Sequence, residues 1–158
     1  MKHIIKLLFL DVDGTLTDGK IYMGPNGEMM KAFDIKDGCG IHDIAIPNGI
    51  TPVICTGRKS EIVLNRCKEL SIDHVYQGVS NKKEKIIEVA GGVLPEYLAY
   101  MGDDINDLEC MQMIKDNGGL IGCPSDAVQK VKDIADFTAP HEGGHGAVRD
   151  FIEWIVNE

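Results

Sequence analysis

The sequence has 158 residues, 44% of them hydrophobic and 26% charged, which is the balance of one globular domain and excludes a disordered or fibrous chain. Its formal net charge of −9 would repel a polyphosphate backbone, so we expect no nucleic-acid partner. No apolar run approaches the length of a bilayer span, and the five cysteines lack Cys-x-x-Cys spacing, so we expect a cytoplasmic protein without membrane contact whose thiols stay reduced.

Short apolar runs alternate with stretches of helical character along the whole chain. The run from Ile4 to Leu10 is typical of a strand buried on both faces of a parallel sheet. The alternation predicts βαβ units and a single α/β domain over residues 1–158. Four further strands are expected at Thr51 to Cys55, His74 to Tyr76, Tyr97 to Met101 and Gly119 to Ile121.

Two segments interrupt or follow this alternation. Residues 20–33 read as two short strands around Gly24-Pro25-Asn26-Gly27, which predicts a β-hairpin too small to be a separate lid domain. A glycine-rich tail at residues 140–146 precedes a last amphipathic helix at residues 147–156.

Start and stop signals frame the helices between these strands. Ser60 is expected to begin one helix, and Asn81 with Glu84 resembles a capping box that begins the next. The pairs Asn48-Gly49 and Gly91-Gly92 are helix stops by the same reasoning.

Polar residues gather where the expected strands end. In a doubly wound sheet, ligands bind outside the carboxyl ends of the strands. The residues that fall there combine a carboxylate nucleophile, a second carboxylate, a hydroxyl, a cation and an acidic cluster, which is an inventory for phosphoryl transfer. They are Asp11, Asp13, Thr56, Gly57, Arg58, Lys82, Asp103, Asp104 and Asp107.

The two carboxylates after the first strand suit two roles. Asp11 is expected to attack phosphorus and form an aspartyl-phosphate, while Asp13 gives a proton to the leaving group and later activates water. Taken alone, Asp-x-Asp-Gly is equally compatible with ordinary turn chemistry. The ordered arrival of the other groups at later strand ends favours the catalytic interpretation.

The remaining groups would neutralise charge. Asp11, the backbone carbonyl of Asp13 and Asp103 offer the hard oxygen ligands that Mg²⁺ prefers. Thr56 and Gly57 can donate hydrogen bonds to a phosphoryl oxygen, and Lys82 supplies a positive charge. Asp107 is expected to hold Lys82 or a metal-bound water, with Asp104 in support.

These motifs resemble those of the haloacid dehalogenase superfamily over almost the whole chain. They are Asp11-Val12-Asp13-Gly14-Thr15, Thr56, Lys82 and Gly102-Asp103-Asp104-x-x-Asp107. The resemblance implies a Rossmann-like fold and the roles above. The absence of a cap domain implies the capless subgroup, and the second aspartate of the first motif implies a phosphatase rather than a dehalogenase.

Further motifs resemble the capless phosphatases of 3-deoxy-D-manno-octulosonate 8-phosphate. This resemblance implies a homotetramer with central hairpins, a role in lipopolysaccharide biosynthesis and a tail that reaches an adjacent site, although His145 stands where the family commonly has Arg. The sugar acid would meet Arg66, Arg58 and the loop from Asp34 to Gly38, which includes Asp37. The motifs are Lys31-Ala32-Phe33, Asp37-Gly38, Thr56-Gly57-Arg58, Tyr76-Gln77-Gly78, Ser80-Asn81-Lys82 and Gly143-Gly144-x-Gly146-Ala147-Val148-Arg149.

Alternatives remain open at this point. A related phosphatase, for 2-keto-3-deoxynononate 9-phosphate, typically carries Glu where this chain has Arg58, so Arg58 favours the eight-carbon substrate. A receiver domain needs a phospho-acceptor Asp where this chain has Cys55-Thr56. A catalytically silent oligomerisation domain is disfavoured by the four intact motif groups. Whether Arg149 binds substrate or stabilises the tail is equally open.

Overall fold

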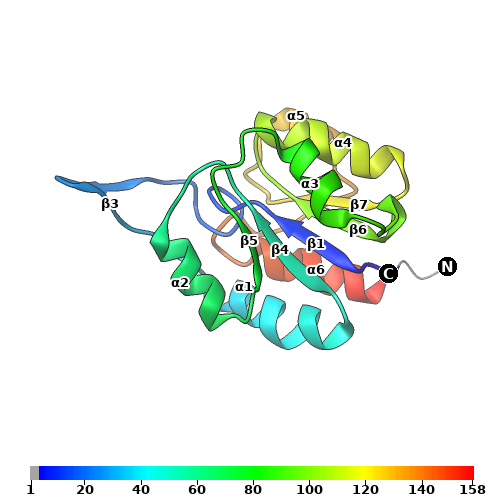
Figure 1. The fold of residues 1–158 in the computed structure, drawn as a ribbon, viewed down its shortest axis with the longest axis horizontal. Coiled ribbons are helices and arrows are strands. Elements are labelled where there is room, and N and C mark those ends of the chain that lie inside the picture. Colours follow the sequence, from blue (N-terminus) through cyan, green and yellow to red (C-terminus); the bar gives the residue numbers. More distant parts are fainter. Residues whose placement is uncertain (1–3) are drawn as a thin grey trace.

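The computed structural model describes residues 4–158, so the first three residues of the expected domain lie outside the described part. Six parallel strands form one sheet in the order β5-β4-β1-β6-β7-β8, which confirms the α/β, Rossmann-like class (Figure 1). The sheet strands are β1 (Leu7–Leu10), β4 (Thr51–Cys55), β5 (His74–Tyr76), β6 (Leu98–Met101), β7 (Leu120–Cys123) and β8 (Phe137–Thr138). The helices are α1 (Ile35–Cys39), α2 (Glu61–Glu69), α3 (Lys82–Ala90), α4 (Leu108–Asp116), α5 (Gln129–Ile134) and α6 (Ala147–Asn157).

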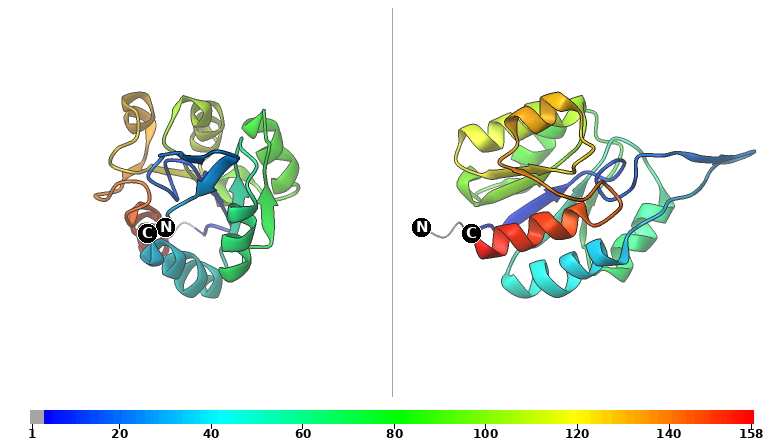
Figure 2. Two further views of the ribbon diagram at one scale, coloured as in Figure 1. Left: turned by 90° about the vertical axis from the view of Figure 1, so that its left-hand side faces the viewer. Right: turned by 180° about the vertical axis from the view of Figure 1, so that it is seen from behind.

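The sheet is covered by helices on both faces, as the continuous apolar strands require. Helices α1, α2 and α6 lie on one face and α3, α4 and α5 on the other (Figures 1 and 2). Strand β1 shows the alternation directly, since Leu8 and Leu10 enter the first core and Phe9 enters the second. Because β1 is hydrogen-bonded to β4 and β6, its carboxyl end lies at the centre of the sheet edge.

Element boundaries depart from the sequence predictions in several places. By one or two residues, β6 begins later than expected, β7 is Leu120–Cys123 rather than Gly119 to Ile121, and α6 ends at Asn157. Strand β1 begins at Leu7 rather than Ile4, whose side chain is largely exposed. The short strand β8 was not predicted, because its two residues make no apolar run. The first helix is α-helical only to Cys39 and continues as a π-helical turn (Gly40–Ala45) and a 3₁₀ turn (Ile46–Asn48), ending at the left-handed Gly49 as expected.

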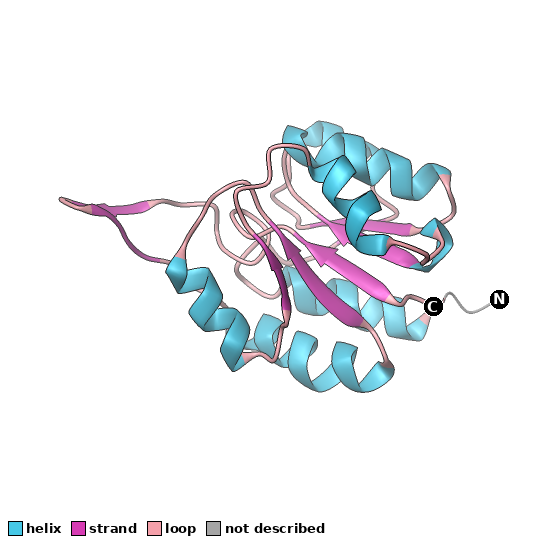
Figure 3. Ribbon diagram, in the orientation of Figure 1, coloured by secondary structure: helices cyan, strands magenta, loops and turns pink. Residues whose placement is uncertain are grey.

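The hairpin follows β1, as predicted, with β2 (Tyr22–Gly24) antiparallel to β3 (Gly27–Met30). It projects away from the body of the domain (Figures 1 and 3). Met23, Met29 and Met30 on it are each more than half exposed.

The glycine-rich tail crosses back over the loop after β1 within the same chain. The amide of Gly144 donates to the carbonyl of Thr15 at 3.2 Å. A Cβ added at Gly143 would collide with the carbonyl of Gly14, so only glycine fits there. The tail then enters α6, whose Trp154 stacks on Phe137 of β8 with ring centroids 5.1 Å apart.

No helix within residues 4–158 has both the length and the apolarity needed to cross a bilayer.

Candidate active site

The loop after β1 carries Asp11 to the carboxyl edge of the sheet. The amide of Asp11 donates to the carbonyl of Met101 at 3.1 Å, so the loop stays joined to β6 beyond the end of the strand. Gly14 then turns the chain with φ = 92°, and a Cβ there would collide with the carboxylate of Asp103. A glycine is therefore required for Asp103 to approach the nucleophile loop.

Lys82 lies at the first position of α3 and points into this edge. Its Nζ is 2.9 Å from Oδ1 of Asp11 and 2.8 Å from Oδ1 of Asp107, and all three side chains are buried. Burial opposes the charge of Lys82, but the two carboxylates outweigh it and raise the pKa of Lys82 above its ordinary value. Lys82 is therefore a fixed positive charge beside the candidate nucleophile.

Asp107 is held by four donors. Its Oδ1 accepts from Lys82 and from the hydroxyl of Tyr100, and its Oδ2 accepts from the amides of Asp103 and Asp104 at 3.0 and 3.2 Å. Four acceptor sites are about what a carboxylate offers, so Asp107 is occupied with positioning its neighbours. The side chain of Asp104 instead points to solvent and accepts from the amide of Ile105 at 2.7 Å.

The acidic cluster fits a divalent cation. Carboxylate oxygens of Asp11, Asp103 and Asp107 lie within 4.8 Å of one another, with Lys82 as their cationic neighbour. Three carboxylates and one ammonium leave two negative charges to neutralise. Burial, together with repulsion from Asp107, raises the pKa of Asp11 well above its ordinary value. Burial raises the pKa of Asp103 to about 6.

Within this cluster Asp11 and Asp103 are the better candidates for direct metal ligands, because Asp107 is already fully hydrogen-bonded. Thr15 orients Asp103 by donating from Oγ1 to its Oδ1 at 3.1 Å. The carboxylate of Asp13 is not part of this cluster. The predicted metal ligand from Asp13 is its backbone carbonyl, and that role stays a prediction.

The loop after β4 brings Thr56 to the same edge. Its amide donates to the carbonyl of Tyr76 at 3.0 Å, and the residue is buried. Gly57 and Arg58 follow it and are exposed. Arg58 reaches toward the nucleophile loop, with Nε 4.0 Å from Oδ2 of Asp13.

The carboxylate of Asp13 is engaged by a residue from the hairpin. Oδ1 of Asp13 lies 2.6 Å from Nζ of Lys31, which also lies 3.0 Å from Oε2 of Glu28. The hairpin thus contributes to the site of its own chain.

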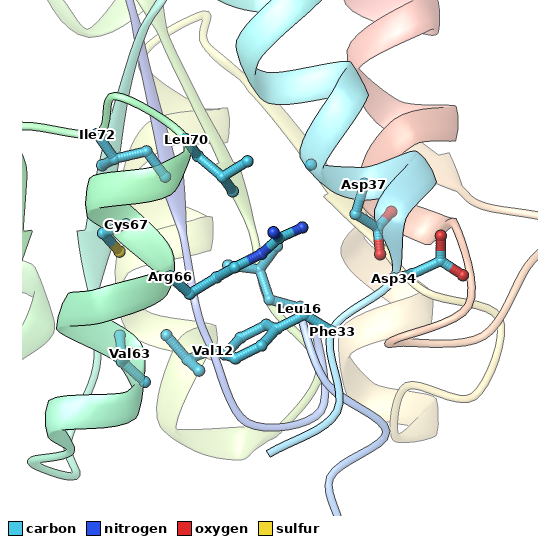
Figure 4. Close-up of a pocket in the computed structure, with 11 residues that line it drawn as sticks. Val12, Leu16, Phe33, Asp34, Asp37, Val63, Arg66, Cys67, Leu70 and Ile72 are labelled. Carbon is cyan, nitrogen blue, oxygen red and sulfur yellow. The ribbon is translucent and has the colours of Figure 1, made fainter. Parts of the chain in front are cut away.

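The segment from Asp34 to Gly38, expected as a loop, is instead the N-cap and first residues of α1. Together with Arg66 it lines part of a small, mostly apolar cavity of about 10 Å³ (Figure 4). Arg66 extends from α2 across it, and a Cβ at Gly38 would collide with the guanidinium of Arg66. Asp34 caps α1 by accepting from the amide of Lys36 at 2.6 Å. Asp37 is buried and accepts from the amide of Arg149 in α6 at 3.0 Å. Substrate contact by these residues stays a prediction.

Three residues of the site were missed by sequence reasoning. Thr15 and Lys31 were quoted within motifs but given no role, because their partners depend on how loops and hairpin pack. Tyr100 carried a usable signal, since a phenol in a fully buried strand needs a hydrogen-bond partner.

Comparison with known proteins places this geometry among sugar-acid phosphatases. No protein-family model matches the chain. The 3-deoxy-D-manno-octulosonate 8-phosphate phosphatase of Escherichia coli K12 is 42% identical over 154 residues, covering 96% of this chain and 79% of the relative.

Solved structures agree. The Yersinia pestis phosphatase of the same name has a TM-score of 0.89 at 38% identity, covering 97% of this chain and 81% of that one. The Moraxella catarrhalis phosphatase, solved with magnesium ion, phosphate ion and KDO, has a TM-score of 0.90 at 35% identity and covers 99% and 87%.

Proposed function

The chain belongs to the 3-deoxy-D-manno-octulosonate 8-phosphate phosphatases of the haloacid dehalogenase superfamily, and from this membership we propose how its residues hydrolyse that sugar-acid phosphate. It is a phosphoric monoester hydrolase of the capless subgroup, and its cofactor is Mg²⁺. The proposal rests on one observation: Nζ of Lys82 is hydrogen-bonded to the carboxylate of Asp11 at the carboxyl edge of the sheet, beside Asp103.

In the first step, an oxygen of Asp11 attacks phosphorus and the bond from phosphorus to the ester oxygen breaks. Asp13 gives its proton to the departing sugar oxygen, so the product leaves as an alcohol. Lys82, fixed beside Asp11, offsets the negative charge of the reacting phosphoryl group, and Thr56 and the amide of Gly57 donate to its oxygens.

In the second step, Asp13 removes a proton from water as the water attacks the phosphorus of the aspartyl-phosphate. The bond to Asp11 breaks, which releases phosphate, restores the carboxylate of Asp11 and leaves the proton on Asp13 for the next cycle. Asp11 and Asp103 would hold Mg²⁺ with the backbone carbonyl of Asp13, and the ion supplies positive charge that lets two anionic reactants meet.

Arg58 supports the eight-carbon sugar acid over 2-keto-3-deoxynononate 9-phosphate. Its side chain is half exposed and lies near Asp13, where the part of the substrate beyond the phosphate would arrive. Asp34, Asp37, Gly38 and Arg66 are the further predicted contacts.

A homotetramer, a cytoplasmic location and a place in lipopolysaccharide biosynthesis belong to the same proposal. The exposed methionines of the hairpin support association, because Met is favoured at adaptable apolar contact surfaces.

A substrate panel with purified protein and Mg²⁺ tests the assignment. We expect 3-deoxy-D-manno-octulosonate 8-phosphate to release phosphate faster than the nine-carbon analogue and p-nitrophenyl phosphate. Equal or slower release would mean that the substrate is wrong. Asp11→Asn should abolish release while the protein stays folded, and retained turnover would exclude Asp11 as the nucleophile.

A further inference from the structure

Lys31 lies immediately after β3 and turns its side chain back from the hairpin to the nucleophile loop. Its Nζ is 2.6 Å from Oδ1 of Asp13 and 3.0 Å from Oε2 of Glu28, and only 2% of its side chain is exposed. A lysine withdrawn from water to this extent must be paired with carboxylates. The hairpin is thereby fastened to the loop that carries both reacting aspartates.

Glu28 extends this contact into a network. Besides Lys31, it faces Nη2 of Arg58 at 3.6 Å and accepts from the hydroxyl of Ser60 at 3.3 Å. Two acidic residues, Asp13 and Glu28, therefore face the same two cations, Lys31 and Arg58. The network joins the hairpin to the loops that follow β1 and β4.

The two oxygens of Asp13 are consequently different. Oδ1 accepts the short bond from Lys31 at 2.6 Å, whereas Oδ2 faces Nε of Arg58 at the longer distance of 4.0 Å. The bond to Oδ1 joins an ammonium to a carboxylate at 2.6 Å. A charge-assisted bond of this kind restrains rotation of the carboxylate.

We propose that Lys31 is a positioning residue that fixes Oδ1 of Asp13, so that Oδ2 alone carries the proton to and from the reacting oxygens. The inference rests on the proposed role of Asp13. Lys31 transfers no proton itself: the proton moves from Oδ2 to the leaving alkoxide as the bond from phosphorus to oxygen breaks, and Oδ2 later takes a proton from water. Without Lys31, the carboxylate turns freely and presents its proton less often.

The test compares leaving groups that do and do not need a proton. Benzyl phosphate releases a basic alkoxide, whereas p-nitrophenyl phosphate releases a stable phenolate, and neither contains the sugar. For Lys31→Met, kcat/KM for benzyl phosphate should fall by about 10- to 100-fold, part of the ~10²–10⁴ that general acid catalysis contributes. For p-nitrophenyl phosphate it should change less than about threefold, because kcat/KM covers only formation of the phospho-enzyme.

Lys20→Met is the matched control, because it removes the same charge from an exposed lysine at the base of the same hairpin. It should behave as the wild type with both esters. Lys31→Arg, which keeps a cationic donor, should recover most of the benzyl phosphate activity. If Lys31→Met does not fold by circular dichroism, Lys31→Gln takes its place.

An equal fall with both esters in a folded variant would overturn the inference, because Lys31 would then bind the phosphoryl group or maintain the fold. Unchanged activity with both would overturn it too. If the wild type hydrolyses both esters but not the sugar-acid phosphate, the proposed substrate is wrong and the inference about Lys31 is still decided.

Discussion

The hydroxyl of Tyr100 donates a hydrogen bond to Oδ1 of Asp107, the oxygen that also accepts from Lys82. Both residues are fully buried, and burial together with the charge of Asp107 raises the pKa of Tyr100 well above its ordinary value. The phenol therefore remains a donor throughout the working pH range. It links the core of the sheet to the residue that positions Lys82.

Tyr100→Phe should destabilise the fold by about 1.5–3 kcal/mol, the range for a hydrogen bond to a charged group. Activity should fall only a few-fold, because Lys82 and two amides still hold Asp107. Urea denaturation and steady-state kinetics measure the two effects. Tyr76→Phe on β5 is the control, and an equal loss of stability there would remove the special role of Tyr100.

Lys82→Met should lower kcat by roughly 10²–10³-fold, as expected for loss of a group that stabilises transition-state charge. It should also cost roughly 3–5 kcal/mol of folding free energy, because Asp11 and Asp107 become buried carboxylates without their cation. The neighbouring Lys83, paired with Glu109 at 3.6 Å on the surface, provides the control Lys83→Met. If both variants lose activity alike, the loss does not come from the buried site.

Mg²⁺ should raise the thermal midpoint of the wild type, since a ligand that binds only the folded state stabilises it by about 2.7 kcal/mol at one hundred times its Kd. Asp103→Asn should lose most of this gain, because it removes a carboxylate from the cluster. Asp104→Asn, one residue further on and exposed, should keep it. Chelation should stop turnover in the wild type, and added Mg²⁺ should restore it.

Asp37 should make stability depend on pH. Burial raises the pKa of Asp37 to about 6 from its ordinary value of 3.8, so the folded state binds a proton more tightly than the unfolded state does. The contribution of Asp37 to the free energy of unfolding therefore falls as pH rises from about 4 to 6. At 1.36 kcal/mol per pKa unit, the fall is up to about 3 kcal/mol.

Asp37→Asn should remove that dependence while keeping an acceptor for the amide of Arg149. Its stability relative to the wild type should rise between about pH 4 and pH 6 and level off above, as measured by urea denaturation across the range. Asp73→Asn, on an exposed side chain, should show no such trend. A flat difference for Asp37→Asn would mean that Asp37 is not destabilised by burial.

Much of the fold was predictable because its strands are buried on both faces. Strands β4 and β5 have the predicted bounds, and the polar residues after β1, β4 and β6 meet at one edge because parallel strands bring their carboxyl ends together. The pairing of Lys82 with Asp107 was one of two predicted alternatives, and the structure contains it.

Other features depend on contacts between distant segments and leave no local pattern. Lys31 meets Asp13 only because the chain that leaves the hairpin returns beside the loop after β1, a path that no periodicity specifies. The burial of Asp37 depends on α6, more than one hundred residues later in the chain. Gly38 looks like a weak helix residue in sequence, yet Arg66 occupies the space that a side chain would need.

The tail that crosses the nucleophile loop also sets when the enzyme can first work. Gly143 and Gly144 pack directly on Gly14, Thr15 and Thr17, while Asp103 must already be in place against Gly14. A nascent chain that has Asp11 and Asp13 outside the ribosome still lacks Asp103, which completes the acidic cluster. It also lacks the glycine-rich tail that packs on the loop after β1. We therefore expect activity to appear only after residue 144 has emerged and folded back onto the start of the domain.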